Sequence, residues 1–299
     1  SNLTLEAFAC LAMAYARGGR HDEAIALSSR TLEHRREVFG DTHPDTLGSM
    51  YELALIFYWQ TGRHDKSIPV LEERLRVCLQ SLGDEDPRTL GARRELALWY
   101  GQCKRFEESA SLFKENLDLQ LRVLGEEHPD TLSSMACLAF RYGDLGRHDE
   151  AEPLLKRVLE IRTRVLGKEH RDTLRSMQNL AARIYRDQYR FEEALPLFEE
   201  TLEIARQSFP EGDKLIGIIL SNYGSCLILM ERYGEAESML LEAYGILSAA
   251  PGVAKINFEQ SIERLAILYD RWGKPEKAAE WWSKLLEGTD PRTPTGWNG

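Results

Sequence analysis

The stretch His128-Pro129-Asp130-Thr131-Leu132 decides the fold of this chain, because it or a close variant occurs four times at an almost constant interval. Successive copies start 43, 42 and 42 residues apart. A fixed period in this range is typical of arrays in which each repeat is one supersecondary unit that packs on its neighbours. The sequence therefore predicts an array of repeats. The copies occupy residues 43–47, 86–90, 128–132 and 170–174.

A pair of residues, mostly Leu-Ala, follows each copy, and the same pair recurs upstream and downstream of the four copies. An aromatic or aliphatic residue stands four positions after each Leu, one helical turn on and therefore on the same helix face. This spacing predicts one helix per repeat, with the pair on its core side. The pairs begin at Leu11, Leu53, Leu96, Leu138, Leu180, Tyr223 and Leu265, and the residues one turn on are Tyr15, Phe57, Tyr100, Tyr142, Ile184, Leu227 and Tyr269.

A short break ends each of these helices, and a second helix is expected after it. Glycine in the break supplies the left-handed backbone that ends a helix. The second helix opens on acidic residues, which the helix dipole favours at an N-terminus. Seven helical hairpins are predicted. The break residues are Gly19, Gly62, Gly146 and Gly273, with Lys104, Tyr189 and Glu231 at the same place in the other repeats.

Two local details of the hairpins follow from the pattern. The Pro-Asp-Thr ahead of the first helix is typical of a helix start, where Pro restricts the preceding backbone and Asp or Thr caps free amides. The second and fifth repeats carry one extra residue between the Leu-Ala pair and the break. A loop is expected to absorb this residue without disturbing the packing.

Composition excludes several classes of protein. With 43% hydrophobic and 29% charged residues and no apolar run of the roughly 18 residues that a membrane span needs, the sequence is typical of a soluble folded chain. The net charge of -10 is unfavourable for nucleic acid or an anionic membrane. The five widely spaced cysteines are expected to be small core side chains in a reducing compartment. A cytoplasmic location is expected.

The pattern Leu-Ala-x-x-Tyr-x-x-x-Gly-Arg-x-x-Glu-Ala resembles the tetratricopeptide repeat (TPR), and the 42-residue period with its His-Pro-Asp-Thr-Leu stretch is similar to the kinesin-light-chain-like subfamily. The resemblance implies an all-α, right-handed superhelical solenoid of seven helix-turn-helix hairpins over residues 1–287. Residues 288–299 are expected to be a flexible tail. The expected repeats are about 4–40, 43–83, 86–125, 128–167, 170–210, 213–250 and 254–287.

The sequence indicates no catalytic, cofactor or metal site. Six of the seven histidines occupy equivalent positions in different repeats, so in a solenoid they lie in rows and do not converge on one ion. The motifs of zinc proteases, serine hydrolases, P-loop proteins and dinucleotide-binding proteins do not occur. Most carboxylates stand beside Lys or Arg at helix-surface spacing, which favours a solvated face. The chain is therefore not expected to be an enzyme.

The resemblance implies a binding surface on the concave wall of the superhelix, which the first helix of each hairpin lines. Asn179 and Asn222 match the asparagine that family members use for peptides, since an amide can pair with any extended backbone. Cys10 and Cys137 depart from this pattern, and each position could instead be an ordinary solvent-facing residue. The groove candidates, in the two positions before each Leu-Ala pair, are Tyr51, Glu52, Arg94, Glu95, Gln178, Asn179, Asn222 and Arg264, with Ser221 and Glu263 in the same positions.

Charge is unevenly distributed along the chain. Residues 160–190 contain eight Lys or Arg against four acidic residues, within a chain of net charge -10. At helical spacing Arg175 and Arg186 could share the concave side with Gln178 and Asn179, and such a cluster favours an acidic peptide or a free carboxylate. A solvated basic helix face is the alternative.

These features predict a non-enzymatic protein-protein interaction module that binds a peptide or protein segment in its groove. No methionine precedes Ser1. Similar arrays form the C-terminal halves of bacterial serine/threonine kinases and of nucleotide-binding signalling ATPases, so the chain is expected to be part of a larger signalling or scaffold protein. The alternative is a self-associating structural spacer that positions an attached enzymatic domain.

The last hairpin gathers three of the six tryptophans. Trp281 and Trp282 point about 100° apart on a helix, so one is expected to pack inward while the other is at least partly exposed. A last repeat has no following neighbour, so this end is expected to dock on a second copy, giving a homodimer, or on the tail with Trp297. A capped, fully buried arrangement is the alternative.

Overall fold

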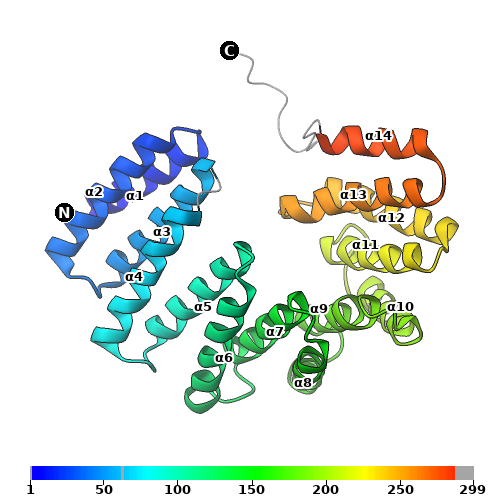
Figure 1. Ribbon diagram of the computed structural model, residues 1–299, viewed down its shortest axis with the longest axis horizontal. Helices are drawn as coiled ribbons and strands as arrows, with labels where there is room; N and C mark the ends of the chain where they lie inside the picture. Colours follow the sequence, from blue (N-terminus) through cyan, green and yellow to red (C-terminus); the bar gives the residue numbers. More distant parts are fainter. Residues whose placement is uncertain (1, 62–63, 287–299) are drawn as a thin grey trace. The chain divides into compact units, whose positions relative to one another are not determined.

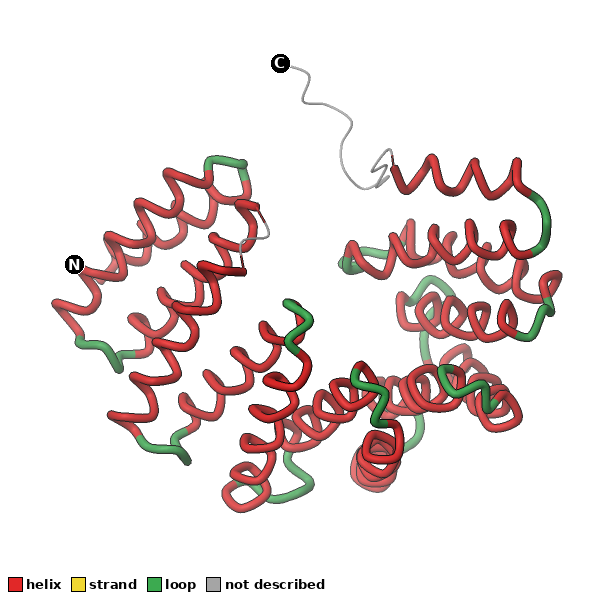
Figure 2. Tube along the Cα trace, viewed as in Figure 1, coloured by secondary structure: helices red, strands yellow, loops and turns green. Residues whose placement is uncertain are grey.

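The computed structural model describes residues 2–61 and 64–286. Within these residues the regular elements are fourteen α-helices and one π-helical segment, with no β-strand (Figures 1 and 2). The predicted all-α class is confirmed. None of the helices in these ranges is both long and apolar enough to cross a membrane. The expected tail at residues 288–299 lies outside the described residues.

The chain divides into two compact units, of which the first is Ser1–Arg147. Each helix of this unit packs on the next one along the chain, both within a hairpin and from one hairpin to the next. This is the packing that the repeat pattern predicts. The helices are α1 (Asn2–Arg17), α2 (His21–Phe39), α3 (Pro44–Thr61), α4 (His64–Leu82), α5 (Pro87–Gln102), α6 (Phe106–Val123) and α7 (Pro129–Asp144).

The second unit, His148–Gly299, is built in the same way from α8 onward. The first helices of its last two hairpins, α11 and α13, also pack against each other. Neighbouring hairpins therefore meet along their first helices. The elements are α8 (His148–Leu166), α9 (Arg171–Leu180), the π segment η1 (Ala181–Arg186), α10 (Phe191–Ser208), α11 (Lys214–Leu229), α12 (Tyr233–Ala249), α13 (Lys255–Arg271) and α14 (Pro275–Leu286).

The small residue of each Leu-Ala pair lies where the helices approach most closely. Ala97, Ala181 and Ala266 have no exposed surface. In the sixth repeat Gly224 replaces the alanine, and a Cβ atom there would lie 2.7 Å from Leu240 Cγ of α12. Because this separation is shorter than a van der Waals contact, glycine allows α11 and α12 to pack closely. The core role predicted for the pair is confirmed in six repeats, whereas in the first repeat Leu11 is 41% exposed and only Ala12 is buried.

The helix starts are capped by a different residue from the one expected. The Nδ1 atom of His128 accepts a hydrogen bond from the Asp130 amide at 3.1 Å, so the cap is the first residue of the repeated stretch and not its Asp or Thr. The reason is that the residue before the first helical turn is still extended, whether or not Pro follows it, so its side chain can reach the open amides of the helix. His43, Asp86, His170 and Asp213 cap their helices in the same way.

The breaks between helices adopt the predicted left-handed conformation even where they lack glycine. Lys104, Tyr189 and Glu231 have φ values of 59–60°, close to the 72–78° of the glycines in the equivalent place. The non-glycine residues therefore hold a conformation that disfavours a side chain. The equivalent glycines among the described residues are Gly19, Gly146 and Gly273.

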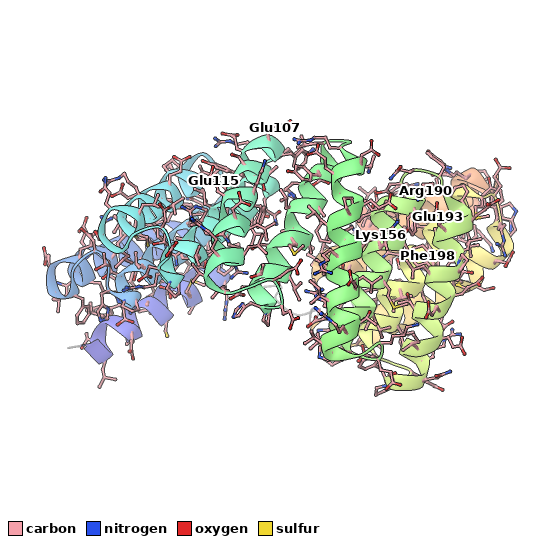
Figure 3. The ribbon with its side chains drawn as sticks, turned by 90° about the horizontal axis from the view of Figure 1, so that it is seen from below. Glu107, Glu115, Lys156, Arg190, Glu193 and Phe198 are labelled. Carbon is pink, nitrogen blue, oxygen red and sulfur yellow. The ribbon has the colours of Figure 1, made fainter. Side chains whose placement is uncertain are left out.

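An arginine after the break links the two helices of a hairpin. In the fifth repeat Arg190 lies over the Tyr185 ring, 4.7 Å from its centroid. It also pairs with Glu193 three residues on (Figure 3). The same arginine-over-tyrosine contact measures 4.0 Å in the first repeat and 4.1 Å in the third. These arginines and glutamates are therefore occupied in holding the hairpin together.

The extra residue of the fifth repeat lies inside the first helix and not in a loop. Residues Ala181–Arg186 form a π-helical turn, which holds more residues per turn than an α-helix. An insertion taken up inside the helix keeps the core side chains on both sides of it in place, which is why no loop is needed. The loop prediction is therefore wrong for this repeat, whereas the break of the second repeat lies outside the described residues.

The π turn also changes which residue follows the Leu-Ala pair in the core. The Arg190 amide donates to the Tyr185 carbonyl at 2.7 Å, as the Arg147 amide does to Tyr142 at 2.8 Å. Tyr185 therefore occupies the position that the sequence pattern assigned to Ile184. Ile184 is fully buried beside it.

The last hairpin confirms that its adjacent tryptophans face different surroundings. Trp281 is 8% exposed, and its ring meets the Tyr244 ring edge-on at 4.9 Å. Trp282 is partly exposed and donates its Nε1 hydrogen to Asp270 at 2.9 Å. Docking of this end on a second copy stays a prediction, and Trp297 lies outside the described residues.

The cysteines only partly follow the core prediction. Cys78 and Cys226 are buried, and burial raises the pKa of the Cys226 thiol to about 11. Cys103 and Cys137 are half-buried. Cys10 is exposed, because it stands two residues before the buried Ala12 and therefore about 200° around the helix from it.

Candidate functional site

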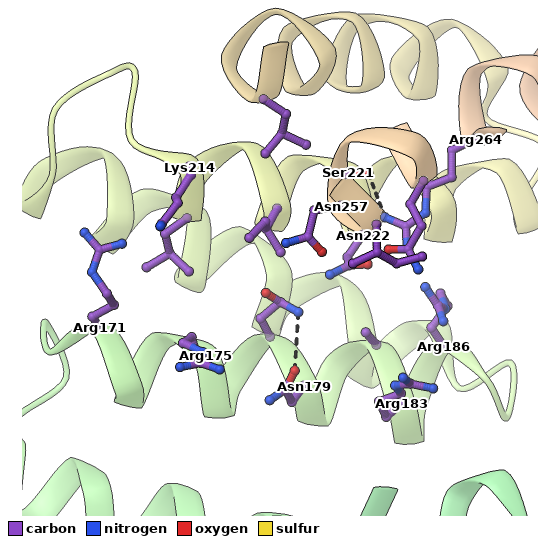
Figure 4. Close-up of a pocket in the computed structure, with 17 residues that line it drawn as sticks. Arg171, Arg175, Asn179, Arg183, Arg186, Lys214, Ser221, Asn222, Asn257 and Arg264 are labelled. Carbon is purple, nitrogen blue, oxygen red and sulfur yellow. Dashed lines mark hydrogen bonds between the residues drawn. The ribbon is translucent and has the colours of Figure 1, made fainter. Parts of the chain in front are cut away.

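The first helices of the last three hairpins line a pocket of about 530 Å³ in the second unit (Figure 4). Each of these helices contributes residues at steps of three or four, that is, from one face. We call this cavity the basic pocket. Its lining residues are Arg171, Arg175, Gln178, Asn179, Ala182, Arg183 and Arg186 from α9 and η1, Lys214, Leu215, Ile218, Ser221 and Asn222 from α11, Leu247 from α12, and Ile256, Asn257, Gln260 and Arg264 from α13.

The lining contains six cationic side chains and no carboxylate. The cations lie in two groups, with amide side chains between them (Figure 4). A rise of 1.5 Å per residue separates Arg171 from Arg183 by roughly 18 Å along the helix. The pocket is therefore elongated, with positive charge toward both ends. One group is Arg171, Arg175 and Lys214, and the other is Arg183, Arg186 and Arg264.

Arg171 is tied to the start of α11. Its two terminal nitrogens donate to the two carboxylate oxygens of Asp213 at 2.9 and 2.6 Å. Asp213 also caps α11 by accepting from the Leu215 amide at 2.8 Å. The hydrogen bonds from Arg171 lower the pKa of Asp213 and raise that of the guanidinium. This pair therefore fixes the width of the pocket at one end.

Two further arginines have aspartate partners that do not line the pocket. Arg175 is exposed and lies 3.5 Å from Asp172 on its own helix. Arg186 contacts the neighbouring Asp187 at 2.6 Å. Both pairs are local to one helix, so both guanidinium groups can still turn toward a ligand in the pocket.

Arg264 has the least ordinary environment of the six cations. Its partner is a neutral one, the Ser221 hydroxyl, which accepts from Nη1 at 2.7 Å. Partial burial lowers the pKa of Arg264 to about 10, and repulsion from Arg186 and Arg183 adds to this effect, while Glu263 and Asp187 oppose it. Arg264 remains charged at neutral pH. A buried cation beside two others is costly unless an anion approaches it.

The centre of the pocket is neutral but polar. The Gln178 amide nitrogen donates to the Asn179 oxygen at 3.4 Å, and Asn222 is buried with 9% of its surface exposed. Leu215, Ile218, Leu247 and Ile256 supply apolar surface, whereas no aromatic side chain lines the cavity. The chemistry offered is therefore hydrogen bonding and aliphatic contact between two cationic ends.

The structure brings six of the ten sequence-predicted groove residues together in the basic pocket. Helical spacing placed them on one face, and the packing of consecutive first helices then brings the faces together. The solvated-face alternative does not describe Arg186 or Arg264, which are both partly buried. The six residues are Arg175, Gln178, Asn179, Arg186, Asn222 and Arg264.

The other four candidates, Tyr51, Glu52, Arg94 and Glu95, belong to the first unit and do not line this pocket. Glu95 pairs with Arg74 of α4, whose guanidinium lies 5.9 Å from the centroid of the Tyr51 ring. Burial raises the pKa of Glu52 despite the nearby Arg35. The contacts of Tyr51 and Glu95 join neighbouring helices, so these two side chains have structural partners already.

Several lining residues were not predicted, because most candidates were taken from the two positions just before each Leu-Ala pair, and the same helix face continues beyond them. Ile218 and Lys214 lie one and two turns before Asn222, and Gln260 lies one turn before Arg264. Extending the steps of three and four residues toward each helix start would have found them. Asn257 and Ile256 follow from the same extension on α13.

A metal centre is not present among the side chains that the structure describes: groups of three or more His, Cys, Asp or Glu that could hold an ion were not found there. The repeat histidines at 43, 128 and 170 are engaged as helix caps. The basic pocket is therefore the site on which a function can be argued.

Comparison with known protein families gives two matches. A tetratricopeptide repeat model matches residues 3–80, 133–207 and 181–249, and a second tetratricopeptide repeat model matches residues 89–130. Together they cover most of the chain. Among curated proteins, none matches its sequence.

Solved structures share the fold. One is a kinesin light chain structure from Podosopora anserina, whose TPR-like repeats are nearly identical to one another. It is 29% identical to this chain and aligns over 69% of this chain and 96% of its own, with a TM-score of 0.60. The apo form of RapI is 15% identical over 95% of this chain and 97% of its own, with a TM-score of 0.67. NprR in complex with its cognate peptide NprX is 17% identical over 95% of this chain and 78% of its own, with a TM-score of 0.57. The resemblance to kinesin-light-chain-like repeats is thus confirmed.

Proposed function

Because this chain belongs to the tetratricopeptide repeat family, we propose that it is a non-enzymatic protein-interaction module that binds a peptide or protein segment. The segment lies in the basic pocket and carries negative charge. The observation that carries this proposal is the lining of six cations without a carboxylate, in a chain whose net charge is -10. Such a local excess of positive charge favours an anionic partner.

The neutral centre of the pocket supports an extended peptide as the ligand. Gln178, Asn179, Asn222, Asn257 and Gln260 each offer an amide that can donate and accept, which suits a peptide backbone of any sequence. A span of roughly 18 Å accommodates about five extended residues at 3.3 Å each. NprR, which shares this fold, was solved with its cognate peptide, so the fold can hold a peptide.

Fluorescence anisotropy with two pools of labelled heptapeptides tests the proposal. One pool has Glu fixed at positions 2 and 6, the other has Gln there, and the remaining positions are degenerate. The Glu pool is expected to bind roughly tenfold more tightly, because charged hydrogen bonds contribute about 1.5–3 kcal/mol each in favourable settings. Added salt should reduce the difference, since screening weakens the attraction.

A double variant, Arg175→Gln with Arg183→Gln, removes two exposed charges of the pocket. It should lose most of the preference for the Glu pool while its circular dichroism spectrum is unchanged. Arg122→Gln, at an exposed arginine of α6, is the matched control and should bind like the parent protein. Equal binding of the two pools by the parent protein would rule out an acidic segment as the ligand.

A further inference from the structure

The basic pocket has two walls of different composition. The wall formed by α9 and η1 contains four arginines, two amide side chains and, as its apolar residue, Ala182 (Figure 4). The wall formed by α11, α12 and α13 also carries cations and amides, but it contains every leucine and isoleucine of the lining. We call these residues the aliphatic patch, which consists of Leu215, Ile218, Leu247 and Ile256.

The repeat pattern does not require the two isoleucines of the aliphatic patch. Ile218 stands five positions before the pair of its repeat, where no other repeat has an aliphatic residue larger than glycine. Ile256 stands nine positions before its pair, where the second to sixth repeats have proline, arginine or lysine. Both isoleucines are therefore particular to this pocket. The residues equivalent to Ile218 are Glu6, Gly48, Gly91, Ser133, Arg175 and Gln260, and those equivalent to Ile256 are Pro44, Pro87, Pro129, Arg171 and Lys214.

The aliphatic patch combines buried and open side chains. Leu215 and Leu247 are 3% and 0% exposed, whereas Ile256 is 58% exposed and Ile218 is half-buried. An aliphatic side chain of a ligand that contacts the patch loses its own water and covers the two isoleucines as well. This removal of apolar surface from water favours binding.

An arginine lies across the pocket from the aliphatic patch. Arg175 and Ile218 occupy the same place in consecutive repeats, and α9 packs against α11. Successive side chains of an extended peptide point to opposite sides. When one residue of a bound peptide contacts the patch, the residues before and after it therefore point to the wall of α9 and η1, which offers cations and amides.

We infer that the aliphatic patch binds an isoleucine, leucine or valine side chain of the bound segment, and that the residues directly before and after this side chain are acidic. This inference rests on the proposed function and adds the order of residues that the pocket selects. An acidic segment without the aliphatic residue leaves Ile218 and Ile256 in water and is bound less tightly.

Fluorescence anisotropy with three pools of labelled heptapeptides tests the inference. The central three residues are Glu-Ile-Glu, Glu-Ser-Glu or Glu-Glu-Ile, and the outer positions are degenerate among Gly, Ser, Asn and Gln, so that no other aliphatic side chain is present. The Glu-Ile-Glu pool is expected to bind about tenfold more tightly than the Glu-Ser-Glu pool. It should also bind about threefold more tightly than the Glu-Glu-Ile pool, in which one Glu points to the same side as the Ile.

Added salt separates the two contributions to binding. Sodium chloride should weaken the Glu-Ile-Glu and Glu-Ser-Glu pools by the same factor, because screening acts on charges and not on the aliphatic contact. The ratio of their affinities is therefore expected to stay constant as salt is added.

Two variants place the aliphatic side chain on the patch. Ile256→Ser, at a 58% exposed position, should reduce the tenfold advantage of the Glu-Ile-Glu pool to about threefold or less, while binding of the Glu-Ser-Glu pool is unchanged. Ile218→Ser on α11 should act in the same direction, so the test does not depend on one helix. Leu241→Ser, at a 42% exposed leucine of α12 outside the lining, is the matched control and should keep the full advantage.

The outcomes separate this inference from the proposed function. If the Glu-Ser-Glu pool binds as tightly as the Glu-Ile-Glu pool, or if both isoleucine variants keep the full advantage, the aliphatic inference is wrong and the acidic-peptide proposal stands. Equal binding of the Glu-Ile-Glu and Glu-Glu-Ile pools would overturn the alternating order. If no pool binds, both the inference and the proposed function fail.

Discussion

At the scale of single residues, three breaks between helices carry a conformational cost that Gly19, Gly146 and Gly273 avoid in three other repeats. Lys104, Tyr189 and Glu231 adopt left-handed backbone where other repeats have glycine. A Cβ atom in this conformation crowds the following carbonyl and costs about 1 kcal/mol. The sequence tolerates this cost because the hydrogen bonds of the break are made all the same, as in the 3.0 Å bond from the Arg232 amide to Leu227.

Replacing Glu231 with Gly is therefore expected to stabilise the protein. The gain should be about 0.5 kcal/mol, since the relief of strain is partly offset by the larger freedom of glycine in the unfolded chain. A higher urea midpoint, followed by circular dichroism, measures it. Glu231→Ala removes the same carboxylate and keeps the strain, so an equal gain in this control would contradict the explanation.

Asp213 gives a prediction with a definite pH dependence. Its hydrogen bonds with Arg171 lower its folded pKa below the ordinary aspartate value of 3.8. A lowered folded pKa means that the pair stabilises the protein above about pH 4, and that this contribution is lost as the pH falls through the folded pKa. Asp213→Asn, which still caps α11, should destabilise the protein by roughly 0.5–1 kcal/mol at pH 7.

Thermal unfolding of the parent protein and the Asp213→Asn variant at several pH values checks this sign. The difference in midpoint should be constant from pH 6 to pH 7 and should shrink as the pH falls below about 4. Asp41→Asn at an exposed surface pair in the first unit is a control that should show a smaller difference. A difference that grows toward low pH would contradict the role given to this pair.

At the scale of elements, the π turn in the fifth repeat connects an insertion with the basic pocket. Ala182, Arg183 and Arg186 all lie on η1 and all line the pocket. Without the extra residue the helix would follow the pattern of the fourth repeat, and Arg183 would stand two residues after Leu180 instead of three, on a different part of the helix surface. The turn therefore sets the direction of the arginines while Tyr185 keeps its core position.

Deleting Ala182 should change the basic pocket without changing the fold. The shortened helix has the spacing between Leu180 and the tyrosine that the fourth repeat has between Leu138 and Tyr142. We expect helix content to be unchanged and affinity for the peptide pool with fixed Glu to fall about tenfold, because Arg183 leaves the pocket. Circular dichroism and anisotropy measure the two effects. Retained affinity in a well-folded deletion variant would show that the π turn does not orient the site.

At the scale of the whole molecule, the end of the last hairpin exposes apolar surface. Leu286 of α14 is 86% exposed, and Trp282 near it is partly exposed. We expect this end to mediate a homodimer with about twice the monomer mass of 34.2 kDa at micromolar concentration. Leu286→Glu should shift the mass measured by light scattering to that of the monomer.

The design of this test depends on the burial of the two tryptophans. Trp281 is buried, so a charge there would disrupt α14 itself and would not report on association. Leu241→Glu, at a 42% exposed leucine of α12, is the matched control and should leave the mass unchanged. If the parent protein is a monomer throughout the concentration range, the spacer alternative loses its support.

The sequence by itself determined the features that repeat and that depend on neighbours along the chain. The Leu-Ala pairs, the left-handed breaks and the order of helices are set by contacts within about one turn or one hairpin, so their spacing predicts them. The same helical spacing placed Asn179, Asn222 and Arg264 on the helix faces that line the basic pocket. It assigned the helix cap to Asp or Thr and not to His128, because the pattern does not show which side chain faces the open amides.

Only the tertiary structure decided which of these faces form a site. Arg264 and Ser221 are 43 residues apart, and their hydrogen bond depends on how α11 and α13 pack. The π turn at Ala181–Arg186 and the aspartate partners of Arg171 and Arg186 likewise decide where positive charge remains unmatched. Side-chain pairing across helices follows packing and burial, which vary from repeat to repeat while the repeat pattern stays the same.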